Sequence, residues 1–158
     1  MQTFLPYADF AASARVLDLR RLGKQRVETL QIIRALTWPT YGWKHHPAVL
    51  MWRGYEEALG AYGMAVVSEW TARGRADTTA ATMLDDLAAA GVRVPPRTQA
   101  QLARLKRRGL PPWVGDEAFH HSHRAALMRK EPEHYGTYFD DVGDGVGIEY
   151  VWPTRRVG

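Results

Sequence analysis

The stretch Arg20-Arg21-Leu22-Gly23-Lys24-Gln25-Arg26-Val27-Glu28 decides the fold, because it begins the first long helix predicted in this 158-residue chain. Asp18 is a suitable N-cap for that helix, and Pro39 ends it near Trp38. Counted from Arg20 at about 100° per residue, one arc between roughly 200° and 280° is apolar. It holds Leu19, Leu22, Leu30 and Ile33. We expect this arc to face the core.

Arg26 is the irregular residue of this helix, because it falls near 240° (roughly), inside the apolar arc. An unpaired buried charge is strongly destabilising, so a buried guanidinium needs a partner. Two interpretations remain open. Arg26 pairs with an internal carboxylate, or the helix borders a cleft at this point and Arg26 contacts a ligand.

The remaining pattern predicts a compact all-α bundle in one domain, residues 1–158, with a long central helix and an irregular C-terminal tail. The central helix is predicted from Ala48 to Ala72. Its three glycines indicate that another element packs closely against it. Further helices are predicted over residues 10–17, 78–90, 98–107, 116–130 and 132–139, and an extended piece over 148–152.

Composition sets the broad limits on function. The formal net charge of +4 favours a polyanionic partner, and the absence of cysteine excludes disulfides, thiolate zinc sites and cysteine nucleophiles. No apolar run approaches the roughly 20 residues that cross a bilayer, and the N-terminus lacks a secretory pattern. We therefore expect a cytoplasmic protein that begins at its own Met1, which is retained because Gln2 is large.

Histidines, basic residues and tryptophans form three further groups with alternative interpretations. His45-His46 and His120-His121-Ser122-His123 suit phosphate contact, proton transfer or interior packing better than a metal, because HExxH is absent. Arg104 to Arg108 is a solvated surface or a phosphate anchor. The aromatics Trp38, Tyr41, Trp43 and Trp113 pack internally or stack on an extruded base.

Three segments together resemble a known family. They are Leu22-Gly23-Lys24-Gln25-Arg26-Val27-Glu28, the glycine-bearing helix after His46-Pro47, and the late segment from His121-Ser122-His123-Arg124 to Tyr138. Their order resembles the pyrimidine-dimer DNA glycosylases of the endonuclease V type, and looks closer to an actinobacterial-type branch than to the phage enzyme. These are small all-α repair enzymes.

The resemblance implies a DNA glycosylase with AP-lyase activity and no metal or other cofactor. In this family an N-terminal α-amine attacks C1′ of the damaged nucleotide and forms a Schiff base, a glutamate stabilises the sugar cation, and arginines clamp phosphates. Transferred residue by residue, the expected catalytic residues are Met1, Glu28, Arg26 and Lys24, with Lys24 as the alternative nucleophile.

The expected partner is double-stranded DNA that carries a base lesion, bound without a membrane or an obligate protein partner in a nucleoid-associated location. The residues expected to contact DNA are Arg20, Arg21, Lys44, His46, His121, His123, Arg124 and Lys130.

Two features differ from the family pattern. Met1 stands where the phage-type enzyme exposes a small threonine, and Val27 separates Arg26 from Glu28, which point about 160° apart on the helix. Glu28 can instead join Lys24 and Arg21 in an ion-pair network. A non-catalytic DNA-binding module and a histidine-metal hydrolase remain alternative functions.

Overall fold

The computed structural model describes residues 1–94 and 109–153, and within these it contains seven α-helices and no β-strand. The predicted all-α fold is confirmed. The helices are α1 (Phe10–Val16), α2 (Leu19–Thr37), α3 (Pro47–Leu50), α4 (Glu56–Ala72), α5 (Thr79–Ala89), α7 (Glu117–Lys130) and α8 (Pro132–Tyr135). The helix predicted over residues 98–107 lies outside the described residues.

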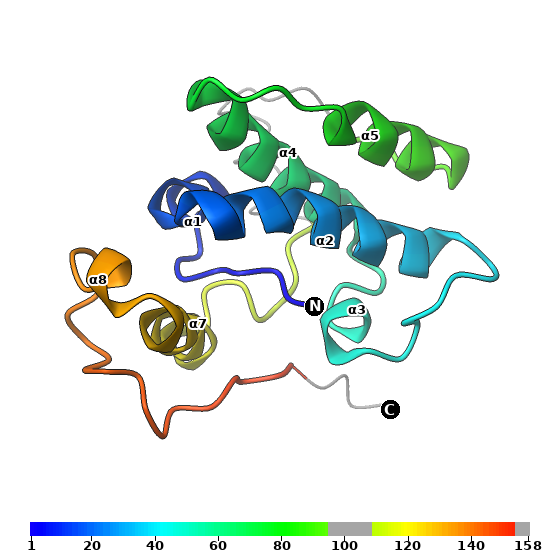
Figure 1. Ribbon diagram of the computed structural model, residues 1–158. Helices are drawn as coiled ribbons and strands as arrows, with labels where there is room; N and C mark the ends of the chain where they lie inside the picture. The colour runs from blue at the N-terminus through cyan, green and yellow to red at the C-terminus, as the bar shows by residue number, and fades with distance from the viewer. Residues whose placement is uncertain (95–108, 154–158) are drawn as a thin grey trace.

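Helix α2 lies in the middle of the fold, packed against α4 and α5, with α7 and α8 on the opposite side in Figure 1. It begins as predicted, because the Asp18 carboxylate accepts a hydrogen bond of 3.3 Å from the Arg21 backbone N–H. It also ends as predicted, with Trp38 as C-cap directly before Pro39. The stretch from Arg20 to Glu28 thus forms the first half of α2, the helix in the middle of the fold.

The face of α2 that packs into the core is rotated from the predicted arc. Leu22, Gln25, Thr29, Ile32, Ile33 and Ala35 are buried, and on the same wheel they span roughly 60° to 220°. Leu19, which was predicted to face the core because it is apolar, is 39% exposed. The prediction was wrong here because two of the buried residues are polar, which moves the buried arc away from the apolar one.

The predicted long central helix is broken in two. Helix α3 ends at Leu50 and α4 begins at Glu56, and between them Gly54 has a φ of 85°, in the left-handed region that favours glycine. The close packing predicted from the α4 glycines is confirmed. A Cβ on Gly63 would lie 2.7 Å from the Met83 sulfur of α5, so a larger residue there would force the Met83 side chain to move.

The N-terminal segment enters the interior instead of lying on the surface, and Figure 1 shows its end beside α2 in the middle of the molecule. Residues 2–6 are buried, and they lie in no helix. Side chains from distant parts of the chain satisfy their polar groups, as a buried backbone requires. Thr3 is hydrogen-bonded by Trp52, and Phe4 by both Gln25 and Tyr62. Leu5 is hydrogen-bonded by His120 and His123, and Pro6 by Arg124.

Candidate active site

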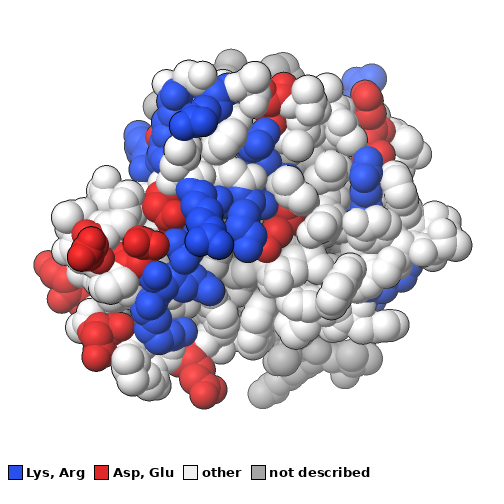
Figure 2. Space-filling view, viewed as in Figure 1, with Lys and Arg blue, Asp and Glu red and all other residues white. Residues whose placement is uncertain are grey.

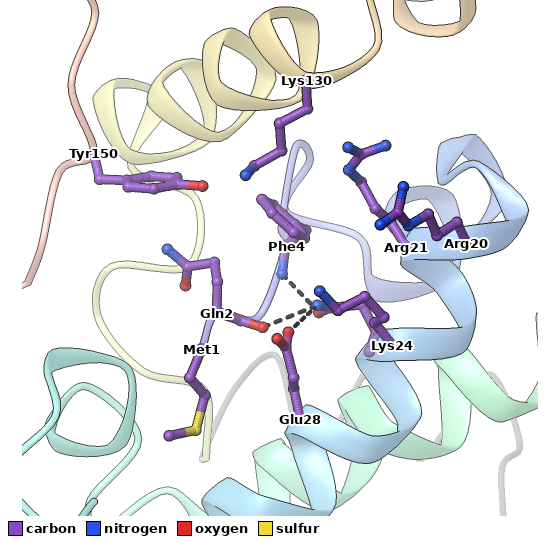
Figure 3. A pocket seen from close by; sticks show the side chains of 10 residues that line it. Met1, Gln2, Phe4, Arg20, Arg21, Lys24, Glu28, Lys130 and Tyr150 are labelled. Carbon is purple, nitrogen blue, oxygen red and sulfur yellow. Dashed lines mark hydrogen bonds between the residues drawn. The ribbon is translucent and has the colours of Figure 1, made fainter.

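A cavity of about 350 Å³ opens between the first half of α2, the N-terminal segment, the end of α7 and the C-terminal tail (Figure 3). This volume lies within the range of small-molecule sites, about 300–1,000 Å³. The residues that line it are Met1, Gln2, Phe4, Arg20, Arg21, Lys24, Gln25, Glu28, Lys130 and Tyr150. Three of the four predicted catalytic residues, Met1, Lys24 and Glu28, are therefore brought together.

The rim of the cavity is cationic. Arg20, Lys24 and Lys130 have no ion-pair partner among the described residues, whereas Arg21 pairs with Asp18 at 3.2 Å and Glu131 at 3.4 Å. Figure 2 shows Lys and Arg side chains gathered in the middle of this face, over the first half of α2. Unpaired cations beside a cavity attract an anionic ligand.

Glu28 is the one carboxylate among the described residues that line the cavity. Its Oε2 accepts a hydrogen bond of 3.0 Å from the side-chain amide of Gln25. The alternative ion-pair network with Lys24 and Arg21 is not formed. In Figure 3 the Glu28 carboxylate points into the space that Lys130 and Tyr150 enter from the other side.

Gln25 was not among the predicted site residues, yet it connects the walls of the cavity. Its side chain is fully buried, and its amide makes four hydrogen bonds. Oε1 accepts from the Phe4 N–H at 2.9 Å and the Tyr62 hydroxyl at 2.6 Å, and Nε2 donates to the Gln2 carbonyl at 2.9 Å and to Glu28. Its position on the wheel, near 140° (roughly), between Glu28 and the apolar arc, was the available signal.

Arg26 is the predicted catalytic residue that does not line the cavity, because its guanidinium is held by other residues. Its Nη1 lies 2.5 Å from Asp77 Oδ1, and its guanidinium lies 4.1 Å from the centre of the Trp70 ring. Burial opposes ionisation of Asp77, but hydrogen bonds from Thr79, Ala80 and Arg26 lower its pKa. Of the two interpretations open for Arg26, the structure shows the internal ion pair. Arg26 and Glu28 lie on different sides of α2, as their positions on the helical wheel predicted.

Two predicted DNA contacts on α7 support the interior instead. His123 is fully buried, and burial lowers its pKa to about 3, so it is neutral. Its Nδ1 accepts the Leu5 N–H at 3.0 Å. Arg124 is 7% exposed and bonds the Pro6 carbonyl as well as Asp141. Neither side chain lines the cavity or has a free face for phosphate.

The remaining predicted contacts lie away from the cavity lining. Lys44 Nζ donates to the Ala35 carbonyl at 3.0 Å, at the end of α2. His121 Nε2 lies 3.1 Å from the Asp141 carbonyl oxygen. His46 caps α3 through its Nδ1, which accepts the Ala48 N–H. Burial and the N-terminal positive charge lower the pKa of His46 while Glu28 raises it, so the ring is within electrostatic reach of the site.

A row of aromatic rings leads from the cavity to the surface. Tyr150 lines the cavity and lies 5.5 Å from Trp152, which lies 6.2 Å from His46, and His46 lies 6.1 Å from Trp43. Trp43 is 66% exposed, with a φ of 65°. Trp113, in contrast, is buried and donates to the Met51 carbonyl, which is internal packing.

Neither a metal site nor a membrane-spanning helix is present in residues 1–94 and 109–153. Among those residues no three His, Asp or Glu side chains gather where a metal could bind. None of their helices is both long and apolar enough to cross a membrane. The basic run Arg104 to Arg108 lies outside the described residues.

The N-terminal half, which carries most of the cavity, identifies the family. A family model described as pyrimidine dimer DNA glycosylase matches residues 1–83, so the chain belongs to that family. The matched region includes Met1, Lys24, Gln25 and Glu28, whereas Lys130 and Tyr150 lie beyond it. No curated protein and no solved structure matches the chain.

Proposed function

We propose that the cavity beside α2 is the active site of a DNA glycosylase with AP-lyase activity, acting on pyrimidine dimers or another damaged pyrimidine. The observation that carries this proposal is the meeting of an amine and a carboxylate in one cationic cavity: Met1, Lys24 and Glu28 all line it. The family description supplies the glycosylase class. We further propose that the chain acts as one domain, since Lys130 and Tyr150 complete a cavity begun by the matched region.

The proposed chemistry uses the amine as nucleophile. Its nitrogen attacks C1′, the C1′–N bond to the damaged base breaks, and the base leaves with the electron pair and takes a proton. The sugar ring then opens at the bond between C1′ and its ring oxygen, which gives a protonated Schiff base. Removal of a C2′ proton expels the 3′ phosphate, and water hydrolyses the Schiff base to release the enzyme amine.

Glu28 has two proposed tasks in this sequence. Its carboxylate stabilises the positive charge that develops on the sugar as the base leaves, and it takes the C2′ proton during elimination. Within the described lining it is the one carboxylate able to do both. The α-amine of Met1 is the preferred nucleophile, because α-amines ionise near pH 8 (roughly) and lysine amines near 10.4 (roughly) in model peptides. Lys24 is the alternative.

The unpaired cations Arg20, Lys24 and Lys130 are proposed to hold the phosphates on either side of the lesion. The exposed ring of Trp43 ends the aromatic row and offers a stacking surface for an unpaired base. Removing a base from a duplex requires the nucleotide to leave the stack, so such a surface has a use.

The test is base release and strand cleavage on duplexes that each carry one lesion, with a pyrimidine dimer and an abasic site included. The expected result is cleavage at both, lost in Glu28→Gln. Salt-sensitive binding without base release from any lesion, unaffected by Glu28→Gln, would instead support a non-catalytic DNA-binding module.

A further inference from the structure

The N-terminal segment and Glu28 are held by one side chain, the amide of Gln25. The amide orientation is fixed by its partners, because Oε1 faces the Phe4 N–H and Nε2 faces the Gln2 carbonyl and the Glu28 carboxylate. A reversed amide would place a donor against a donor and an acceptor against two acceptors. Gln25 therefore has one orientation, and its four bonds are all used.

This amide connects the backbone of the N-terminal segment to the Glu28 carboxylate, two parts of the cavity wall. One bond fixes the backbone of Gln2, the neighbour of Met1, and another fixes the carboxylate of Glu28 (Figure 3, dashed lines). The hydroxyl of Tyr62, fully buried in α4, supports the amide from behind at 2.6 Å. The residue next to Met1 and the Glu28 carboxylate thus share one support.

We propose that Gln25 is a positioning residue that holds the Met1 amine and the Glu28 carboxylate in the arrangement the reaction needs. This inference rests on the proposed function. Gln25 is part of the cavity wall, but its side chain is buried and its amide is fully used by four protein partners, so it supports the neighbouring groups and does not act on the substrate directly. Its contribution is to reaction rate and not to DNA affinity, since a misplacement of about 1 Å can cost about 100-fold in rate.

Gln25→Glu is the sharpest test, because it exchanges one NH2 for an oxygen. The new carboxylate keeps an acceptor for Phe4 and Tyr62 but, when ionised, faces the Gln2 carbonyl and the Glu28 carboxylate with no donor. When protonated it can donate again to one of them. The charged or titratable groups that line the same cavity or bind the amide are Arg20, Arg21, Lys24 and Glu28 of α2, Tyr62 of α4, Lys130 of α7, Tyr150 of the tail and the Met1 amine.

The measurement is the single-turnover rate of adduct formation with an abasic duplex and borohydride, from pH 5 (roughly) to 8 (roughly), with DNA affinity by anisotropy. We expect Gln25→Glu to react about 10- to 100-fold more slowly at neutral pH with unchanged affinity, and to regain rate relative to wild type as the pH falls. Gln31→Glu, the same exchange on α2 outside the cavity, is the matched control and is expected to match wild type.

Tyr62→Phe keeps the test decisive if Gln25→Glu does not fold at neutral pH. It removes the hydroxyl behind the amide, and a rate several-fold below wild type at unchanged affinity is expected. The inference would be overturned if folded Gln25→Glu formed the adduct at the wild-type rate, or if its loss of rate did not change with pH. A wild-type rate of adduct formation in Tyr62→Phe would overturn it as well. No adduct with the wild-type protein would instead overturn the proposed function itself.

Discussion

Glu28 accepts a hydrogen bond of 3.0 Å from Gln25, three residues earlier on α2, and the same amide binds the carbonyl of Gln2 at 2.9 Å. One side chain therefore connects the carboxylate of the cavity to the first residues of the chain. The helix contributes both the group proposed to react and the group that supports it.

Glu28→Gln is expected to abolish base release and strand cleavage, with a loss of at least about 100-fold, the lower end of typical acid–base contributions. The amide keeps the size of the side chain but cannot take a proton or stabilise a cation. DNA affinity should not fall, since the variant removes a negative charge from a cationic cavity that is proposed to bind phosphates. Rapid-quench cleavage and anisotropy on the same duplex measure both quantities; equal cleavage by the variant would exclude Glu28 from the chemistry.

Lys130→Ala is expected to weaken duplex binding uniformly across sequences and to reduce the dependence of affinity on salt. One lost phosphate contact changes the slope of log K against log salt by about 0.9. Lys130 carries no ion pair among the described residues, so its removal leaves no buried charge behind. Titrations at several salt concentrations check this. If the slope of log K against log salt did not change, Lys130 would not contact a DNA phosphate.

Trp43→Ala is expected to lower affinity for DNA that contains an unpaired base, by about 1–3 kcal/mol if the ring stacks on it. The effect should be smaller for intact duplex and should change little with salt, because stacking releases no counterions. Trp43→Phe keeps a ring and should retain much of the affinity. Equal losses on intact and lesion-containing duplex would contradict a stacking role.

Asp77→Asn is expected to lower the stability of the protein while leaving the reaction rate of the folded fraction near wild type. The substitution leaves the partly buried Arg26 without its anionic partner, and breaking such a pair costs about 3–5 kcal/mol when it is fully buried. The cost is expected to be smaller here, since the Arg26 side chain is 16% exposed. Urea unfolding and single-turnover kinetics separate the two effects. A lost rate at full stability would return Arg26 to the active site.

His123 is expected to make the protein less stable as the pH falls below 6.5. Its pKa is about 3 when folded, because burial disfavours the charged ring, against 6.5 for an exposed histidine. Between these values the unfolded chain binds a proton that the folded protein does not, so the free energy of unfolding falls by about 1.4 kcal/mol per pH unit. Above pH 6.5 the stabilising contribution of the neutral His123 is fully present, and below pH 3 the free energy of unfolding loses nothing more from this group.

His123→Asn supplies the comparison, since an amide oxygen can accept the Leu5 N–H without titrating. The variant should lose less stability than wild type between pH 6.5 and pH 4.5 (roughly). His120, whose pKa burial also lowers, contributes the same sign in both proteins and cancels in the difference. Parallel stability curves for the two proteins would show that His123 is protonated inside the folded structure.

The sequence was sufficient to predict the ends of α2, because Asp18 and Pro39 act locally, through a side-chain cap and a missing N–H. It was not sufficient for Arg26, whose partner Asp77 lies 51 residues later and becomes a neighbour only when α5 packs on α2. The break before α4 was missed because Gly54 resembles the helical glycines until its φ is known.

The site was predicted in part for a related reason. The resemblance named Met1, Lys24 and Glu28, which the cavity brings together. Gln25 was missed because an amide signals little by itself, and its importance comes from two partners in the N-terminal segment and one on α4. His123 was predicted as a DNA contact from its residue type, whereas burial decides whether an imidazole can carry charge, and the sequence did not show that burial.

The central claim, that an amine of this cavity forms a Schiff base with the sugar, is tested most directly by borohydride trapping followed by peptide mapping. The purified protein is incubated with an abasic duplex and borohydride, and the covalent complex is digested and sequenced by mass spectrometry. The account predicts a stable adduct on the N-terminal peptide, at the Met1 amine, or on Lys24 as the alternative nucleophile. No adduct under any condition, or an adduct on a lysine remote from the cavity, would contradict it.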